Sequence, residues 1–156
     1  MNLESQTKTI DTYDVTVQKL PAVRGSRLRV RLLKLVSPGL ARLGELRGQT
    51  FDQVMGSNVS SLLPALVGIV TQLEDKVQDA LMLEVFACTY VISTNSQGTK
   101  VKHELSSLSN LDQAFGSDVD SMWKAFAFTL EVNLGGFFDA IKKLAPGASL
   151  PLAPSS

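Results

Sequence analysis

The sequence holds a single cysteine, Cys88, and a single histidine, His103. One cysteine excludes a disulfide within the chain. Structural zinc sites usually take four nitrogen or sulfur ligands, so these two residues do not predict a metal centre. A nucleophilic site would combine His103 with Cys88 or a serine, and no local pattern supports such a pairing. We therefore interpret His103 as a polar residue on a strand, and we expect a protein that is not an enzyme.

Long hydrophobic runs and phosphate-binding motifs are also missing. The apolar stretches at 62–70 and 81–92 contain Pro64 and Glu84, and both are too short to span a bilayer. The first eleven residues are polar and include no apolar signal segment. No glycine-rich loop has the spacing that cradles a phosphate. We expect neither a membrane partner nor a bound cofactor.

The charge is balanced overall but unevenly distributed. The chain has 15 basic and 15 acidic residues, which does not favour nucleic acid as a partner. The stretch from Lys19 to Arg47 is nevertheless strongly basic, and Arg24, Arg27 and Arg31 recur in it at helical spacing. This basic stripe is compatible with a solvated face or with an acidic protein partner. Phosphate contacts are disfavoured because no aromatic side chain accompanies the stripe for base stacking.

Local patterns predict two short β regions and flexible ends. Residues 1–11 are polar and are expected to form a flexible leader. Alternation over 12–17 predicts a strand, and the runs at 86–92 and 101–105 predict a small β-hairpin. Residues 145–156 are rich in proline and serine and are expected to be a disordered segment.

Helical patterns fill most of the remaining chain. Helices are predicted after Pro21 and at 40–46, 58–73, 74–84, 109–115 and 117–143. The sequence therefore predicts a single globular helical domain over residues 1–144. Its fold class is expected to be α+β, mainly α-helical, with a short N-terminal strand and a small β-hairpin.

Large aromatic side chains concentrate in the last predicted helix. Trp123, Phe126 and Leu130 share one face at helical spacing, and Phe137-Phe138 follow further along. Asn133 and the two glycines after it are expected to loosen or kink the helix before this pair. Such a helix is either buried on several sides or offers a face to a partner, and ordinary core packing is favoured for any single ring.

The segment Phe126–Phe138, FAFTLEVNLGGFF, resembles the C-terminal signature of tail assembly chaperones of bacteriophages with contractile tails. Leu111–Phe115, LDQAF, resembles the acidic and aromatic segment that precedes this signature. Tyr13–Val17 and the following Leu20-Pro21-Ala22 resemble the N-terminal part of these proteins. The resemblance covers both ends and the greater part of the chain.

This resemblance implies a factor in the host cell cytoplasm that binds the tape measure protein and keeps it soluble during tail morphogenesis. Such a factor is expected to be absent from the mature virion, and the task needs no cofactor or nucleophile. A homo-oligomer is compatible with it. The alternative is a small structural protein of the phage tail or baseplate. The candidate partner-binding residues are Trp123, Phe126, Leu130, Phe137, Phe138, Arg24, Arg27 and Arg31.

Overall fold

A computed structural model of the chain describes residues 4–32, 34 and 67–144, with the side chains of α6 described as far as residue 134. The chain begins with two strands and a helix over residues 22–32. After a helical turn at 67–70, it continues with helices and two further strands. The named elements are β1 (Ser5–Ile10), β2 (Tyr13–Gln18), α4 (Asp75–Val85), β3 (Thr89–Thr94), β4 (Lys100–Glu104), α5 (Leu108–Phe115) and α6 (Val119–Leu144).

The four strands form one antiparallel sheet in the order β1-β2-β3-β4. Val15 of β2 lies opposite Val91 of β3, and both are fully buried. Their neighbours Thr16 and Tyr90 form the next pair and point to the other, more exposed face. This alternation of apolar and polar positions is what a half-buried antiparallel strand requires, because successive side chains point to opposite faces.

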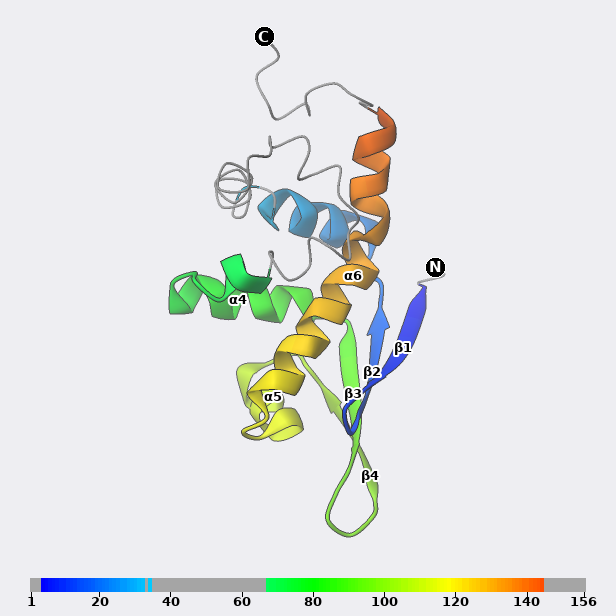
Figure 1. Cartoon of the computed structure of the whole chain (residues 1–156), viewed down its shortest axis with the longest axis vertical. Coiled ribbons are helices and arrows are strands. Elements are labelled where there is room, and N and C mark those ends of the chain that lie inside the picture. The colour runs from blue at the N-terminus through cyan, green and yellow to red at the C-terminus, as the bar shows by residue number, and fades with distance from the viewer. Residues whose placement is uncertain (1–3, 33, 35–66, 145–156) are drawn as a thin grey trace.

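Helix α6 covers the apolar face of the sheet. Figure 1 shows it running along one side of the sheet, with α4 and α5 on its side away from β1. Phe126 of α6 is fully buried and meets Phe86 edge-on, with ring centroids 5.7 Å apart. Leu130 is also fully buried one turn later. Phe86 is the residue that ends α4, so this ring contact joins α6 to α4 beside the sheet. Burying side chains of this size contributes about 1.5–3 kcal/mol each.

Capping side chains set the ends of the last two helices. The Ser107 hydroxyl accepts a hydrogen bond from the Asn110 amide and begins α5, and Gly116, with φ of 59°, ends it. Asp118 Oδ1 accepts from the Ser121 amide at 3.1 Å at the start of α6. These are the short polar residues that satisfy otherwise unpaired amides at a helix N-terminus. The positions agree with the breaks that the sequence predicts near 116–118.

The predicted fold class is wrong. A mainly α-helical protein with one short N-terminal strand and a separate small hairpin was expected, whereas a continuous four-stranded sheet is the centre of an α+β fold. Residues 5–10, which the sequence places in a flexible leader, form β1. Their side chains are polar except Ile10, because β1 is an edge strand whose residues 5–9 are exposed. Exposure removes the apolar alternation by which a strand is normally detected.

Other sequence predictions have mixed outcomes. The helix after Pro21 and the pairing of β3 with β4 fall where they are predicted. Helix α6 continues through residues 133–136, so Asn133 and the glycines after it do not end the helix. The predicted helix at 40–46, most of the one at 58–73 and the segment 145–156 lie outside the described residues.

Candidate functional site

The first component of the candidate site is Asn133, a buried polar residue of α6 with 5% of its surface exposed. Its Oδ1 accepts a hydrogen bond from the backbone amide of Leu20 at 3.0 Å. Its Nδ2 donates to the Thr129 carbonyl, also at 3.0 Å. A buried amide without a partner costs about 1–3 kcal/mol, so the Leu20 amide needs this acceptor. Asn133 thus joins α6 to the segment that enters the 22–32 helix.

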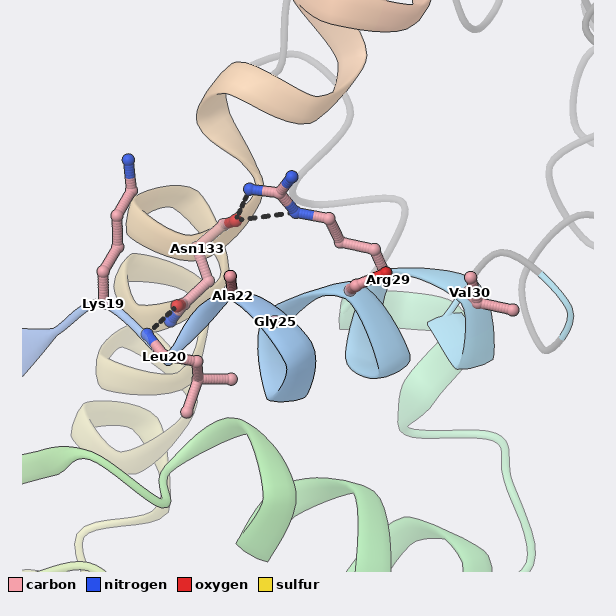
Figure 2. A pocket seen from close by; sticks show the side chains of 8 residues that line it. Lys19, Leu20, Ala22, Gly25, Arg29, Val30 and Asn133 are labelled. Carbon is pink, nitrogen blue, oxygen red and sulfur yellow. Dashed lines mark hydrogen bonds between the residues drawn. The ribbon is translucent and has the colours of Figure 1, made fainter.

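Arg29 reinforces the same junction from the other side. Its Nη2 and Nε donate to the backbone carbonyl of Asn133, at 2.9 and 3.3 Å. Figure 2 shows Arg29 reaching from the 22–32 helix towards α6, while the Asn133 side chain points to the Leu20 amide. One α6 residue therefore holds the N-terminal helix through both its side chain and its carbonyl.

A pocket of about 340 Å³ lies at this junction. It is lined by Lys19, Leu20, Ala22, Gly25, Ser26, Arg29, Val30 and Asn133. The lining includes two cationic side chains and no acid. Its size suits a few side chains of a partner better than a large cofactor. The pocket therefore favours an acidic or amide group that enters beside apolar atoms.

The outward side of the 22–32 helix is amphipathic. Val23 and Val30 are 64% and 49% exposed and, seven residues apart, lie on the same side of the helix. Arg24 and Arg27 are exposed next to them. We call these four residues the Val23–Val30 face. Exposed valines flanked by arginines are typical of a surface that binds an amphipathic partner helix carrying acidic side chains.

The structure separates the predicted basic stripe into two parts. Arg31 forms an ion pair with Glu84 of α4, so this arginine links two elements of the protein itself. Arg24 and Arg27 belong to the Val23–Val30 face. The pairing of Arg31 with α4 could not be predicted from spacing along one helix.

The predicted aromatic residues take core positions as far as their side chains are described. Phe126 and Leu130 have no exposed surface, and Trp123 is half-buried. Trp123 meets Phe126 edge-on at 5.3 Å between ring centroids. Contact between Phe126 or Leu130 and a partner would require the core to open. The side chains of Phe137 and Phe138 lie outside the described part of α6, although their backbone is helical.

Among the described residues, Asp11 and Tyr13 have shifted pKa values, and both lie near the N-terminal end of α6. The Ser121 hydroxyl, 2.6 Å from Asp11 Oδ2, and the Lys124 ammonium hold the pKa of Asp11 below its ordinary 3.8. Burial raises the pKa of Tyr13 above its ordinary 10.0, and the Asp118 and Asp11 carboxylates add to this effect. Because these groups fasten the β1–β2 turn to α6, we assign them to the fold and not to a reaction.

The described residues form neither a metal site nor a membrane-spanning helix. No group of three or more His, Cys, Asp or Glu side chains is placed to hold a metal ion there. None of the described helices combines the length and the apolar character needed to cross a membrane.

The described site is thus a basic and apolar surface built on a small α+β fold, of the kind that other proteins bind. The family described as "Phage tail assembly chaperone protein, TAC" matches residues 11–146, which include β2, the pocket and all of α6. The chain belongs to this family of phage tail assembly chaperones. No curated protein and no solved structure matches the chain.

Asn133 is a site residue that the sequence did not predict. It lies within the segment Phe126–Phe138, where an asparagine before two glycines was expected to loosen the helix. The available signal was an asparagine among apolar residues in a helix, which usually indicates a buried hydrogen bond. A tail assembly chaperone interacts with phage tail proteins during assembly, so a surface for protein partners is the expected functional feature.

Proposed function

We propose that this protein binds the tape measure protein in the host cytoplasm, keeps it soluble while the tail is assembled, and is absent from the finished virion. It acts by binding alone, without catalysis and without a cofactor. Family membership supports a role in tail assembly. The resemblance of the segment Phe126–Phe138 to the chaperones of contractile-tailed phages supports the choice of client.

The observation that carries this proposal is the Val23–Val30 face. Two valines at 64% and 49% exposure leave apolar surface in water beside Arg24 and Arg27. Covering that surface with apolar side chains of the client is favourable by about 25 cal/mol per Å². The arginines select client helices that carry acids on the flanks of their apolar stripe.

The neighbouring pocket adds a point of recognition. Arg29 and Lys19 line the pocket, and its lining includes no acidic side chain. A client carboxylate or amide that enters there would receive charge-assisted hydrogen bonds next to Val30. Because both cations already have partners, in the Asn133 carbonyl and Glu4, the added attraction is moderate. Moderate affinity suits a chaperone whose client must be released to the growing tail.

The test is coexpression of the full chain with the tape measure protein of the same phage, followed by separation of soluble and insoluble fractions. The native chain is expected to keep the client soluble. Val30→Asp is expected to abolish this effect because it replaces one of the two exposed valines of the Val23–Val30 face with a charge. Val119→Asp is the matched control, since Val119 is 57% exposed at the start of α6, away from that face.

Two results would contradict the proposal. An insoluble client in the presence of the native chain would remove the chaperone role for this client. Equal solubilisation by the Val30→Asp and Val119→Asp variants would remove the proposed surface. Mass spectrometry of purified virions separates the alternative function, because a structural tail or baseplate protein would be present there in many copies.

A further inference from the structure

The second surface of interest is the outer edge of β1, the first strand in the sheet order. The backbone amide of Lys19 donates to the Glu4 carbonyl at 2.7 Å. Glu4 and Lys19 are therefore a hydrogen-bonded pair of the antiparallel β1–β2 ladder. Bonded and non-bonded residues alternate along an antiparallel pair, so every second residue from Glu4 onward bonds to β2. The residues between them, Ser5, Thr7 and Thr9, therefore direct their backbone N–H and C=O groups outwards. Figure 1 shows β1 as the outermost strand of the sheet.

A groove of about 400 Å³ adjoins this edge on the side of the sheet that α6 covers. It is lined by residues 8–11 of β1 and its turn and by Lys124, Ala127, Phe128 and Glu131 of α6. The spacing of these four residues places them on one side of the helix. Sheet edge and groove together form what we call the β1 edge surface.

We propose that the β1 edge surface binds a second copy of this chain, with the two β1 strands paired antiparallel about a two-fold axis at Thr7. The two four-stranded sheets would then form one continuous sheet. Antiparallel pairing of a strand with its own copy uses the same residues on both sides, as a closed dimer requires. Pairing also satisfies the outward backbone groups that an exposed edge leaves open.

The charge of β1 selects the register. With Thr7 opposite Thr7 of the second copy, Lys8 lies opposite Gln6 of that copy, and Ser5 lies opposite Thr9. A shift of the centre by one residue towards the turn would place the two copies of Lys8 opposite each other, which is unfavourable. The Thr7-centred register also uses the whole of the outward-facing edge.

Glu131 of α6 supplies the complementary charge. Lys124 lies 3.3 Å from Asp11, and Phe128 lies beside Lys8, whose Nζ is 5.7 Å from the ring centroid. Helix α6 thus runs antiparallel to β1, and Glu131 lines the groove one turn beyond Phe128, in the direction of Gln6. In the Thr7-centred register, Lys8 of the second copy lies opposite Gln6 and reaches the same end of the groove. Within the described part of the chain, Lys8 and Glu131 have no oppositely charged partner, so each would gain one.

Helix spacing is compatible with this arrangement. Paired strands lie about 4.8 Å apart, and α6 packs on both β1 and β2. The two α6 helices would lie on the same side of the joined sheet, with axes on the order of 10 Å apart. Packed helices have interaxial distances of about 8–10 Å, so the helices would meet along the groove without separating the strands.

The first test is the mass of the full chain in solution, measured by sedimentation and native mass spectrometry over a concentration series. A dimer is expected. Thr7→Pro removes an outward N–H that the internal β1–β2 ladder does not use, so the variant should fold and its dimer dissociation constant should rise at least about tenfold. Lys102→Pro is the matched control at the opposite edge, β4, and should remain dimeric.

The second test exchanges charges. Lys8→Glu and Glu131→Lys should each weaken the dimer about tenfold, because each places like charges together across the interface. The double variant K8E/E131K should recover the native dissociation constant. This recovery distinguishes a direct pair from a general effect of charge on folding, and it decides the question if Thr7→Pro fails to fold.

Several results would overturn the proposal. One is a native chain that stays monomeric over the whole concentration series. This holds also if the β1 edge of the monomer binds an extended segment of another protein. Another is a folded Thr7→Pro variant that dimerises like the native chain. A third is a double charge variant that is no better than the single ones.

Discussion

The side-chain amide of Asn133 accepts a hydrogen bond at 3.0 Å from the backbone amide of Leu20, 113 residues earlier in the chain. This contact closes the junction between the N-terminal segment and α6, and it forms one wall of the basic pocket. Asn133, which belongs to the segment that resembles the chaperone signature, thus lines the pocket and holds the helix that carries the Val23–Val30 face.

Replacing Asn133 should therefore destabilise the protein. Asn133→Ala leaves the Leu20 amide buried without an acceptor, and we expect the free energy of unfolding to fall by about 1–3 kcal/mol. Urea unfolding followed by circular dichroism measures this change. Asn110→Ala is a matched control, because its lost hydrogen bond to the Glu104 carbonyl is exposed and should cost less. Equal losses in the two variants would contradict the role given to Asn133.

Phe126 provides a test of core against surface. Because Phe126 is fully buried, Phe126→Ala should lower the free energy of unfolding by about 3–5 kcal/mol. Val30→Asp should change it by less than about 0.5 kcal/mol, since Val30 is exposed and away from the core. Chemical denaturation of both variants decides this. A stable Phe126→Ala variant that has lost client binding would show that the aromatic side of α6 contacts the client.

Asp11 should make stability depend on pH in the acid range. Its pKa is lowered in the folded protein, first by the hydrogen bond from Ser121 and then by Lys124. The stabilisation is therefore present above the ordinary pKa of 3.8 and is lost as the pH falls through the lower folded pKa. Asp11→Asn keeps a residue that tolerates the positive φ of 55° and should reduce this acid dependence.

Urea midpoints at a series of acidic pH values measure the effect of Asp11, which is small because the group is exposed and screened. If Asp11→Asn followed the native curve throughout, the contact with Ser121 would not contribute to stability.

Tyr13 should produce the opposite dependence in the alkaline range. Burial raises its pKa above 10.0, so its contribution is complete below that value and is lost as the pH rises through the folded pKa. Tyr13→Phe keeps the ring that packs on Phe115, at 5.1 Å between centroids, and should remove this alkaline loss. Absorbance titration of the phenols should lose its late phase in Tyr13→Phe. A late phase that persists in this variant would refute the assignment.

The elements predicted correctly from the sequence are those whose burial pattern is visible in the order of their own residues. The alternation of Tyr13, Val15 and Val17 identifies β2, and Pro21 marks the start of the next helix. The family resemblance also depended on local residues, and the match over residues 11–146 agrees with it at the level of the family.

The elements that were missed depend on contacts between distant residues. Nothing local shows that Val15 pairs with Val91, so the sequence predicted a lone strand and a hairpin instead of one sheet. The polar strand β1 shows no apolar period because both of its faces are exposed over residues 5–9. Asn133 has the composition of a helix disruptor, and only its partner 113 residues away reveals its role.

The chain order of this sheet has a consequence for biosynthesis. Strand β2 leaves the ribosome early, but its second neighbour β3 is translated some seventy residues later, and the Leu20 amide must wait for Asn133. The N-terminal hairpin and the 22–32 helix therefore emerge before the surfaces that bury them exist. Folding that depends on such distant pairings is slow, and it cannot be completed before α6 has been translated. The junction beside the Val23–Val30 face therefore exists only once α6 has been made.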